Sequence, residues 1–170
     1  MSTSTTKKVC VRCASLQLLT GYVSPQTFLR SDGIELLERN AQVRLIPYEQ
    51  VRAIYFVRQF EDNPEENQRR QFASRPKSDG LWVRLHFQDG ELLEGLLPND
   101  LLQMTGHGFT ITPPDPNANT QKIFVPRAAL DHLKVLGVIG SPVHRRRSTQ
   151  KPPSKEQMDL FLKEASREAE

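Results

Sequence analysis

The chain has 170 residues, a mean hydropathy of -0.53, a formal net charge of +3 and 25% charged residues. This length allows one ordinary domain or two small ones. No stretch approaches the ~18 consecutive apolar residues of a transmembrane helix, so no membrane insertion is expected. The polar start of the chain lacks the apolar core of a secretory signal, and two cysteines cannot form a disulfide framework. A cytoplasmic protein is therefore expected.

The positive charge is concentrated near the C-terminus. Residues 141–170 hold seven Lys or Arg and five Asp or Glu, and subtracting their +2 from the total of +3 leaves +1 for residues 1–140. A nucleic-acid-binding domain normally carries its positive excess on a folded face. The near-neutral body disfavours that class of function.

The chain contains an internal repeat. Five segments recur in the same order, at offsets that grow from 72 to 79 residues: 9–12 with 81–84, 18–23 with 92–97, 33–36 with 108–111, 44–47 with 123–126, and Val51, Ile54 and Phe56 with Leu130, Leu133 and Val135. Each increase in offset falls where a loop is expected to lengthen. Two copies of one module of roughly 50–60 residues are therefore predicted.

Each copy has the pattern of a small β-domain. Apolar and polar residues alternate in its first segment, as in a half-buried strand. The second copy has a hairpin signal at Asp89-Gly90, and Gly21 and Gly95 lie inside the second strand, where a bend or bulge is the usual reason. A short turn is expected after Pro47 and after Pro126, each followed by a last strand. The prediction is an all-β protein with two tandem five-stranded SH3-like barrels.

The predicted organisation has six parts. In chain order they are a disordered N-terminus (1–7), a first β-barrel module (8–58), a charged linker (59–80), a second β-barrel module (81–140), a disordered basic tether (141–153) and an amphipathic helix (154–170).

Residues 83–97 and 122–133 resemble the two halves of an Sm-like domain, the family of the Sm, LSm and Hfq proteins. The resemblance covers the second copy almost throughout and the first more loosely. It implies a small SH3-like barrel that associates through its edges. It does not carry over RNA binding: the family's Asn after a Met is Thr105 after Met104, and its Arg-Gly pair is replaced by Pro126-Arg127. In the first copy, Ser31 follows Arg30, and Pro47-Tyr48 replaces the Arg-Gly pair.

No combination of residues indicates catalysis, a metal or a cofactor. Cys10 and Cys13 lie on one predicted strand, where residues three apart face opposite sides, so buried or half-buried thiols without a disulfide are expected. A zinc site would need a second ligand pair, which the sequence lacks. The histidines do not have the paired spacing of metal ligands; they are His86, His107, His132 and His144. The protein is therefore expected not to be an enzyme.

Two connecting segments leave structural questions open. The segment 58–80 holds five acidic and five basic residues, and is either a solvated linker or a segment whose Phe72 docks on a barrel. The Pro-rich loop 112–120 is expected to project into solvent.

The C-terminal region contains the candidate binding residues. Residues 154–157 have the pattern of a helix start, and Met158, Phe161, Leu162 and Ala165 then fall on one helical face, a candidate partner-binding surface. This helix is expected to dock on its own chain or a sister chain rather than on another partner. Arg145, Arg146 and Arg147 are candidate phosphate contacts, although three arginines in a basic tail can also be simply solvated.

Two functions from different classes follow. The first is a non-catalytic interaction or assembly module of tandem Sm-like barrels, with a homo-oligomer or a protein partner, steered by the loop 112–120 and the C-terminal helix. The alternative is an RNA-binding protein that uses the same fold and the basic tail. The neutral body and the missing base-reading residues favour the first, because phosphate contacts from a few tail arginines would be weak and sensitive to salt.

Overall fold

The computed structural model describes residues 6–140, except 61, 67, 101, 103 and 116. The chain divides into two units, residues 1–140 and 141–170, and the description below concerns the first. The predicted basic tether and amphipathic helix lie outside the described residues, as do residues 1–5 of the predicted N-terminal segment.

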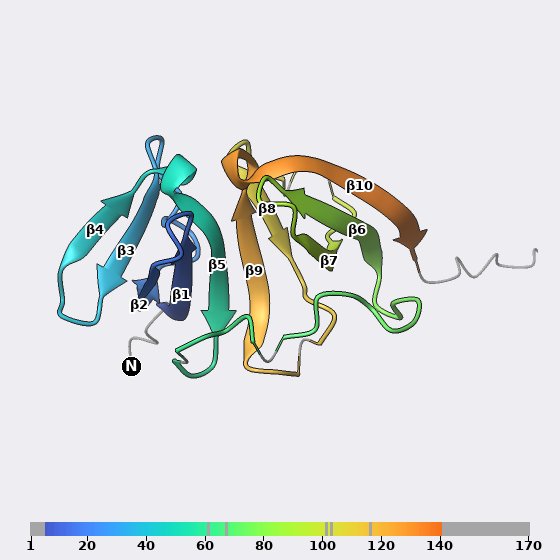
Figure 1. Ribbon diagram of the computed structural model, residues 1–170, viewed down its shortest axis with the longest axis horizontal. Helices are drawn as coiled ribbons and strands as arrows, with labels where there is room; N and C mark the ends of the chain where they lie inside the picture. Colours follow the sequence, from blue (N-terminus) through green and yellow to red (C-terminus); the bar gives the residue numbers. More distant parts are fainter. Residues whose placement is uncertain are drawn as a thin grey trace, which may run out of the picture. The chain divides into compact units, whose positions relative to one another are not determined.

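The described residues form ten strands, five in each copy of the repeat (Figure 1). The first copy contains β1 (Lys7–Cys13), β2 (Leu18–Val23), β3 (Ile34–Glu38), β4 (Val43–Ile46) and β5 (Val51–Val57). The second contains β6 (Gly80–Phe87), β7 (Leu92–Leu97), β8 (Gly108–Ile111), β9 (Thr120–Pro126) and β10 (Leu130–Ile139). The all-β prediction is therefore confirmed for this part of the chain.

The predicted turns occur at the predicted places. A single 3-10 turn follows each proline, at η1 (Tyr48–Gln50) and η3 (Arg127–Ala129), and each leads directly into the last strand of its copy. Proline suits this position because it has no backbone N–H to donate and its φ is fixed. The β6–β7 hairpin turns through Gly90, whose φ of 85° is readily adopted only by glycine.

Matching glycines show that the two copies share their backbone packing. A Cβ added at Gly33 would lie closer than 3.0 Å to the carbonyl oxygen of Ile46, and one at Gly108 equally close to that of Val125. Ile46 and Val125 are counterparts in the repeat, each directly before its proline. The same close approach of the third strand to the fourth therefore occurs in both copies.

Of the bend or bulge expected at Gly21 and Gly95, no bulge is present. The pairings of β1 with β2 and of β6 with β7 run through these glycines without a register shift. An added Cβ would instead meet the Leu37 backbone at Gly21 and the Ile111 side chain at Gly95. These glycines allow a close approach of the third strand rather than a change of register.

The prediction of two separate barrels was wrong. The strands form open antiparallel sheets, one of seven strands in the order β4-β3-β2-β1-β5-β9-β8 and one of three in the order β10-β6-β7, and neither closes among the described residues. The cause is that β9 pairs with β5 of the first copy and not with β10 of its own. The two sheets meet where Leu96, at the end of β7, forms an isolated bridge with Thr112 after β8.

Both hydrophobic cores draw on both copies. The core of the first copy contains Phe124 from β9. The core of the second copy contains Cys10 from β1 and three residues of β5: Ala53, Tyr55 and Val57. At residues 51–55 of β5 and 123–125 of β9, one core therefore lies on each side of the sheet, whereas Gln121 and Lys122 of β9 are exposed.

Both cysteines are buried in strand β1 and neither forms a disulfide, as the sequence predicts. Burial raises the pKa of the Cys13 thiol, although the nearby Arg44 and Arg12 charges oppose the shift. A raised pKa lowers the reactivity of a thiol at neutral pH, because the thiolate is the nucleophile.

The segment between the copies packs against the second copy, as the docking interpretation expects. The Phe72 ring contacts Trp82 of β6 edge to face, with the centroids 6.0 Å apart. The carboxylate of the buried Glu94 accepts hydrogen bonds from the Phe72 backbone N–H, the Trp82 indole and the Arg84 guanidinium. Burial alone would raise the pKa of Glu94, but these hydrogen bonds outweigh it and the pKa lies below its usual value.

The loop 112–120 does not project freely, which corrects the prediction. Pro113 is buried, and Asn119 both accepts hydrogen bonds from the backbone N–H groups of Arg58 and Gln59 and donates one to the Gln59 carbonyl. The amide side chain holds the loop against the start of the linker, a contact that hydrophobic periodicity does not reveal.

The matched glycines generate a stability prediction. Gly33→Ala and Gly108→Ala should each lower the free energy of unfolding by about 1–3 kcal/mol, the usual cost of overpacking. Gly106→Ala is the control, because a Cβ there meets nothing within 4 Å. Denaturant unfolding of the three variants measures the effect, and an unchanged midpoint for Gly33→Ala and Gly108→Ala would contradict the close approach.

Candidate assembly interface

The junction between the copies is a strand pairing, here called the seam, between β5 and β9. Its antiparallel register places Ile54 opposite Phe124, Tyr55 opposite Ile123 and Phe56 opposite Lys122. Ile54 and Phe124 are fully buried in the first core, and Ile123 is fully buried in the second. The seam therefore combines backbone hydrogen bonds with apolar burial on both faces.

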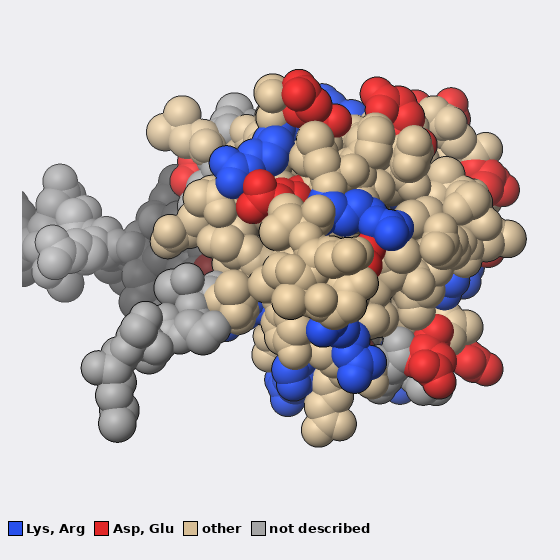
Figure 2. Space-filling view, turned by 90° about the vertical axis from the view of Figure 1, so that its left-hand side faces the viewer, with Lys and Arg blue, Asp and Glu red and all other residues tan. Residues whose placement is uncertain are grey.

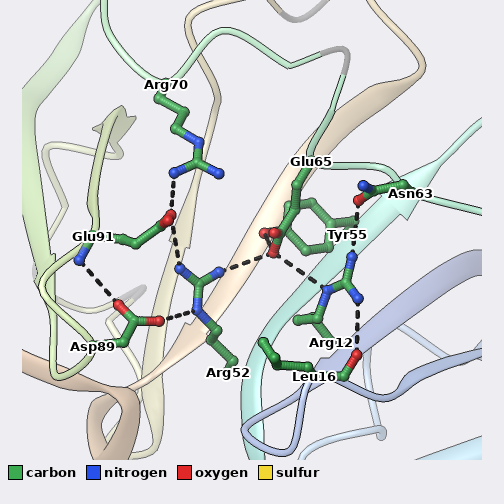
Figure 3. Close-up of polar contacts among 9 residues, drawn as sticks. All are labelled: Arg12, Leu16, Arg52, Tyr55, Asn63, Glu65, Arg70, Asp89 and Glu91. Carbon is green, nitrogen blue, oxygen red and sulfur yellow. Dashed lines mark hydrogen bonds and ion pairs between the residues drawn. The ribbon is translucent and has the colours of Figure 1, made fainter.

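A cluster of charged side chains closes the seam at one end (Figure 3). Arg52 of β5 donates to Asp89 at 2.7 Å and to Glu91 at 3.2 Å, both in the β6–β7 turn, and to Glu65 of the linker at 2.9 Å. Its guanidinium carbon lies 4.4 Å from the centroid of the Phe87 ring. One arginine thus ties together the first copy, the second copy and the linker.

Glu65 connects this cluster to the buried face of β5. Its carboxylate accepts a hydrogen bond from the Tyr55 hydroxyl at 2.7 Å, and the Arg12 guanidinium lies 3.6 Å away. Burial and the Glu65 charge raise the pKa of Tyr55, so its hydroxyl stays protonated and continues to donate. The linker is therefore anchored at Glu65 as well as at Phe72.

Two strand edges remain open at the ends of this arrangement. Strand β4 is hydrogen-bonded only to β3, and β10 only to β6, among the described strands. Both edges carry exposed apolar side chains: Val43 is 67% and Leu45 50% exposed on β4, and Val135 is 52% exposed on β10. Figure 2 shows the side of the molecule that carries β4, where basic and acidic side chains are interspersed with a wide area that has neither. Open edges of this kind can pair with a further strand.

The repeat relates these open edges to the two strands of the seam. Strand β10 is the counterpart of β5, and β4 is the counterpart of β9, both at an offset of 79 residues. If β10 and β4 paired in the same register, Leu133 would lie opposite Leu45, as Ile54 lies opposite Phe124. Val135 would lie opposite Val43, as Phe56 lies opposite Lys122. At the seam the corresponding Ile54 and Phe124 are fully buried, whereas Leu133 is half-buried and Leu45 exposed. A second seam would therefore bury Leu133 and Leu45. The seam counterparts of Val135 and Val43 are the half-buried Phe56 and the exposed Lys122.

One transferred pair is unfavourable. The counterparts of the opposed Tyr55 and Ile123 are Lys134 on β10 and Arg44 on β4, which would lie opposite each other in a second seam. Like charges directly opposite each other destabilise a strand pair. Arg44 is partly compensated by an ion pair with Glu38 at 2.6 Å. A contact between these edges should consequently be weaker than the internal seam.

Two histidines stack on the outer face beside β10. The rings of His86 and His132 lie 3.8 Å apart and nearly parallel, and His132 also contacts the Asp131 carboxylate at 2.8 Å. Desolvation and the charges of His132 and nearby cations lower the pKa of His86. The structure brings together these two histidines, which sequence spacing had not paired, because β10 lies antiparallel to β6.

The candidate residues named from the sequence lie outside the described residues, both the apolar set at 158–165 and the arginines at 145–147. Sequence reasoning missed the β4 edge and the Arg52 cluster. The alternation of Val43 and Leu45 with the polar Gln42 and Arg44 could have indicated an open apolar edge. Nothing in the local sequence around Arg52 indicates its partners, which lie 13 to 39 residues away.

Within the described part of the chain, no group of three or more His, Cys, Asp or Glu residues could hold a metal ion. No helix described there is both long and apolar enough to cross a membrane.

The Arg52 cluster generates a prediction about stability and pH. Arg52→Met should lower the free energy of unfolding by about 1.5–3 kcal/mol near neutral pH, the usual contribution of hydrogen bonds to charged groups. Burial would raise the pKa of Asp89, but the Arg52 hydrogen bond lowers it below its usual value. This contribution is therefore present above the usual Asp pKa of about 4 and is lost as the pH falls through the lowered native value.

Denaturant titrations of wild type and Arg52→Met between pH 7 and pH 2.5 measure this effect. The difference between the two proteins should shrink at the acidic end. Asp131→Asn, on an exposed carboxylate away from the cluster, is the control. A wild-type advantage that stays constant over the whole range would contradict the ionic role of the cluster.

The chain matches a protein-family model. No curated protein and no solved structure matches the chain significantly. One family model matches residues 5–137, which include nine of the ten strands and most of the tenth. The chain belongs to this family, a family of unknown function designated DUF6982.

Proposed function

We propose that this protein is a non-catalytic assembly module that associates head to tail with further copies of itself, through β10 of one molecule and β4 of the next. The observation that carries the proposal is the seam inside the chain. In the seam, β5 pairs with β9 inside one chain, and these strands are the counterparts of β10 and β4. A second seam with the same register would form between two molecules.

The resemblance to Sm-like domains supports this proposal, because that family's small barrels associate through their edges. In this chain, five-stranded modules are joined last strand to fourth strand within one molecule. In this proposal the chain corresponds to two subunits of such an assembly fused in tandem.

The form of the assembly follows from its symmetry. The contact is heterologous, because β10 and β4 are different surfaces, so each added molecule leaves one edge of each kind open. Such contacts give rings when the rotation closes and filaments when it does not. The opposed Lys134 and Arg44 weaken each contact, and we expect association that depends on concentration.

Two single-edge variants test the proposal. Leu45→Lys places a charge on the β4 edge, and Val135→Lys places one on the β10 edge. Each variant alone should be monomeric at concentrations where wild type associates, measured by light scattering behind size exclusion. Leu102→Lys is the control, because Leu102 is a highly exposed leucine outside both edges.

Mixing the two variants distinguishes the head-to-tail contact from a symmetric one. The mixture keeps one intact β10 and one intact β4 edge, so it should form a 1:1 dimer and nothing larger. The Lys134→Glu variant, in which the new carboxylate would face Arg44, should associate more strongly than wild type, because opposite charges replace like charges. A symmetric β4–β4 dimer would instead be abolished by Leu45→Lys and unaffected by Val135→Lys. A wild type that stays monomeric at high concentration would overturn the proposal.

A further inference from the structure

A hollow of about 530 Å³ opens at the end of the first copy, beside the seam. It is lined from β1, the β2–β3 loop, β5, β8 and β9. Its volume falls in the range of sites for small molecules. It lies away from both open edges, since neither β4 nor β10 contributes to it.

The floor of the hollow is apolar and aromatic. Phe28 and Val57 are buried and Phe56 is half-buried at its base. The Phe28 ring is held edge to face against both Phe56 and Phe124, with centroids 5.8 and 5.6 Å apart. These contacts fix the rings in place, so the floor is a formed surface that can receive an apolar group.

The rim of the hollow is cationic. Lys7, Lys8 and Lys122 line it, and no Asp or Glu does. Along the strands, Lys7 shares a face with Val9 of the first core, and Lys122 shares a face with Phe124. No ion pair joins Lys7 or Lys122 to a carboxylate among the described residues. Two lysines from different copies therefore lie at the mouth of one apolar hollow.

The second copy has a neighbouring hollow with a different charge. It shares Thr110 and Lys122 with the first, but Asp79 and Asp100 also line it. Asp79 is the counterpart of Lys7 in the repeat, at the offset of 72 residues found for the first strands. Both copies fold alike, so the cationic rim is a property of these side chains and not a consequence of the fold.

We propose that this hollow binds a small amphipathic organic anion: a carboxylate or phosphate monoester head held by Lys7 and Lys122, with an apolar body on Phe28 and Phe56. The head has to be anionic because the charged side chains that line the hollow are all cations. The body has to be apolar because hydroxyls or charges against the aromatic floor would lose their hydration without a partner. This site is independent of the proposed assembly.

The test uses the full-length protein and an aromatic sulfonate probe, 8-anilinonaphthalene-1-sulfonate, whose fluorescence rises in an apolar site. Decanoate and decyl phosphate should displace the probe, whereas decanol and inorganic phosphate should not, because each lacks one half of the required chemistry. Whichever of decanoate and decyl phosphate displaces at the lower concentration identifies the head group.

Charge variants locate the site. Lys7→Gln combined with Lys122→Gln should weaken displacement by decanoate about tenfold or more, because charge-assisted contacts are lost. Lys77→Gln, an exposed lysine of the linker outside this hollow, should leave it unchanged. Both lysines of the double variant are exposed, so folding should be retained, and a thermal melt checks this. Equal displacement in both variants, or displacement by decanol as strong as by decanoate, would overturn the proposal.

Discussion

The pairing of β5 with β9 is the contact on which the rest of this structure depends. It joins the two copies into one seven-stranded sheet, and it places a hydrophobic core on each face of the same two strands. Phe124 completes the core of the first copy, and Tyr55 completes that of the second. Because each core takes residues from the other copy, neither is fully enclosed by its own five strands. The Arg52 cluster and the docked linker then secure the junction from outside.

The same pairing explains why β4 and β10 are left with open apolar edges. A duplicated module whose last strand pairs with the fourth strand of the next has one unused fourth strand and one unused last strand. In this chain these are β4 and β10, and their exposed or half-buried apolar side chains include Leu133, Val135 and Leu45. In the proposed contact, Lys134 and Arg44 would lie opposite each other and reduce the attraction between the edges, as charged residues at open edges do. In the proposed assembly, the apolar pairs would favour self-association and the like charges would moderate it.

Much of the fold could be predicted from the sequence, because strand periodicity and turn residues are local signals. The five strands per copy, the hairpin at Gly90 and the turns after Pro47 and Pro126 were all predicted in place. The partner of β9 could not be predicted in the same way, since a strand edge has the same local pattern whichever neighbour it pairs with. The lysine-rimmed hollow was also missed, because Lys7 and Lys122 come together only through the pairing of β1 with β5 and of β5 with β9. The predicted helix and arginines of the C-terminal region remain predictions.

The most direct test of this account is disulfide cross-linking between two single-cysteine additions, Val43→Cys and Val135→Cys, in separate protein samples that are mixed and oxidised. Both native cysteines are buried, so they should not compete. The account predicts efficient heterodimer formation, because Val135 corresponds to Phe56 and Val43 to Lys122, and these two residues lie directly opposite each other in the seam. Lys134→Cys in place of Val135→Cys shifts the cysteine by one residue to the other face and should cross-link poorly. Equal yields from the two mixtures, or only homodimers of Val43→Cys, would contradict the claim that the seam is repeated between molecules.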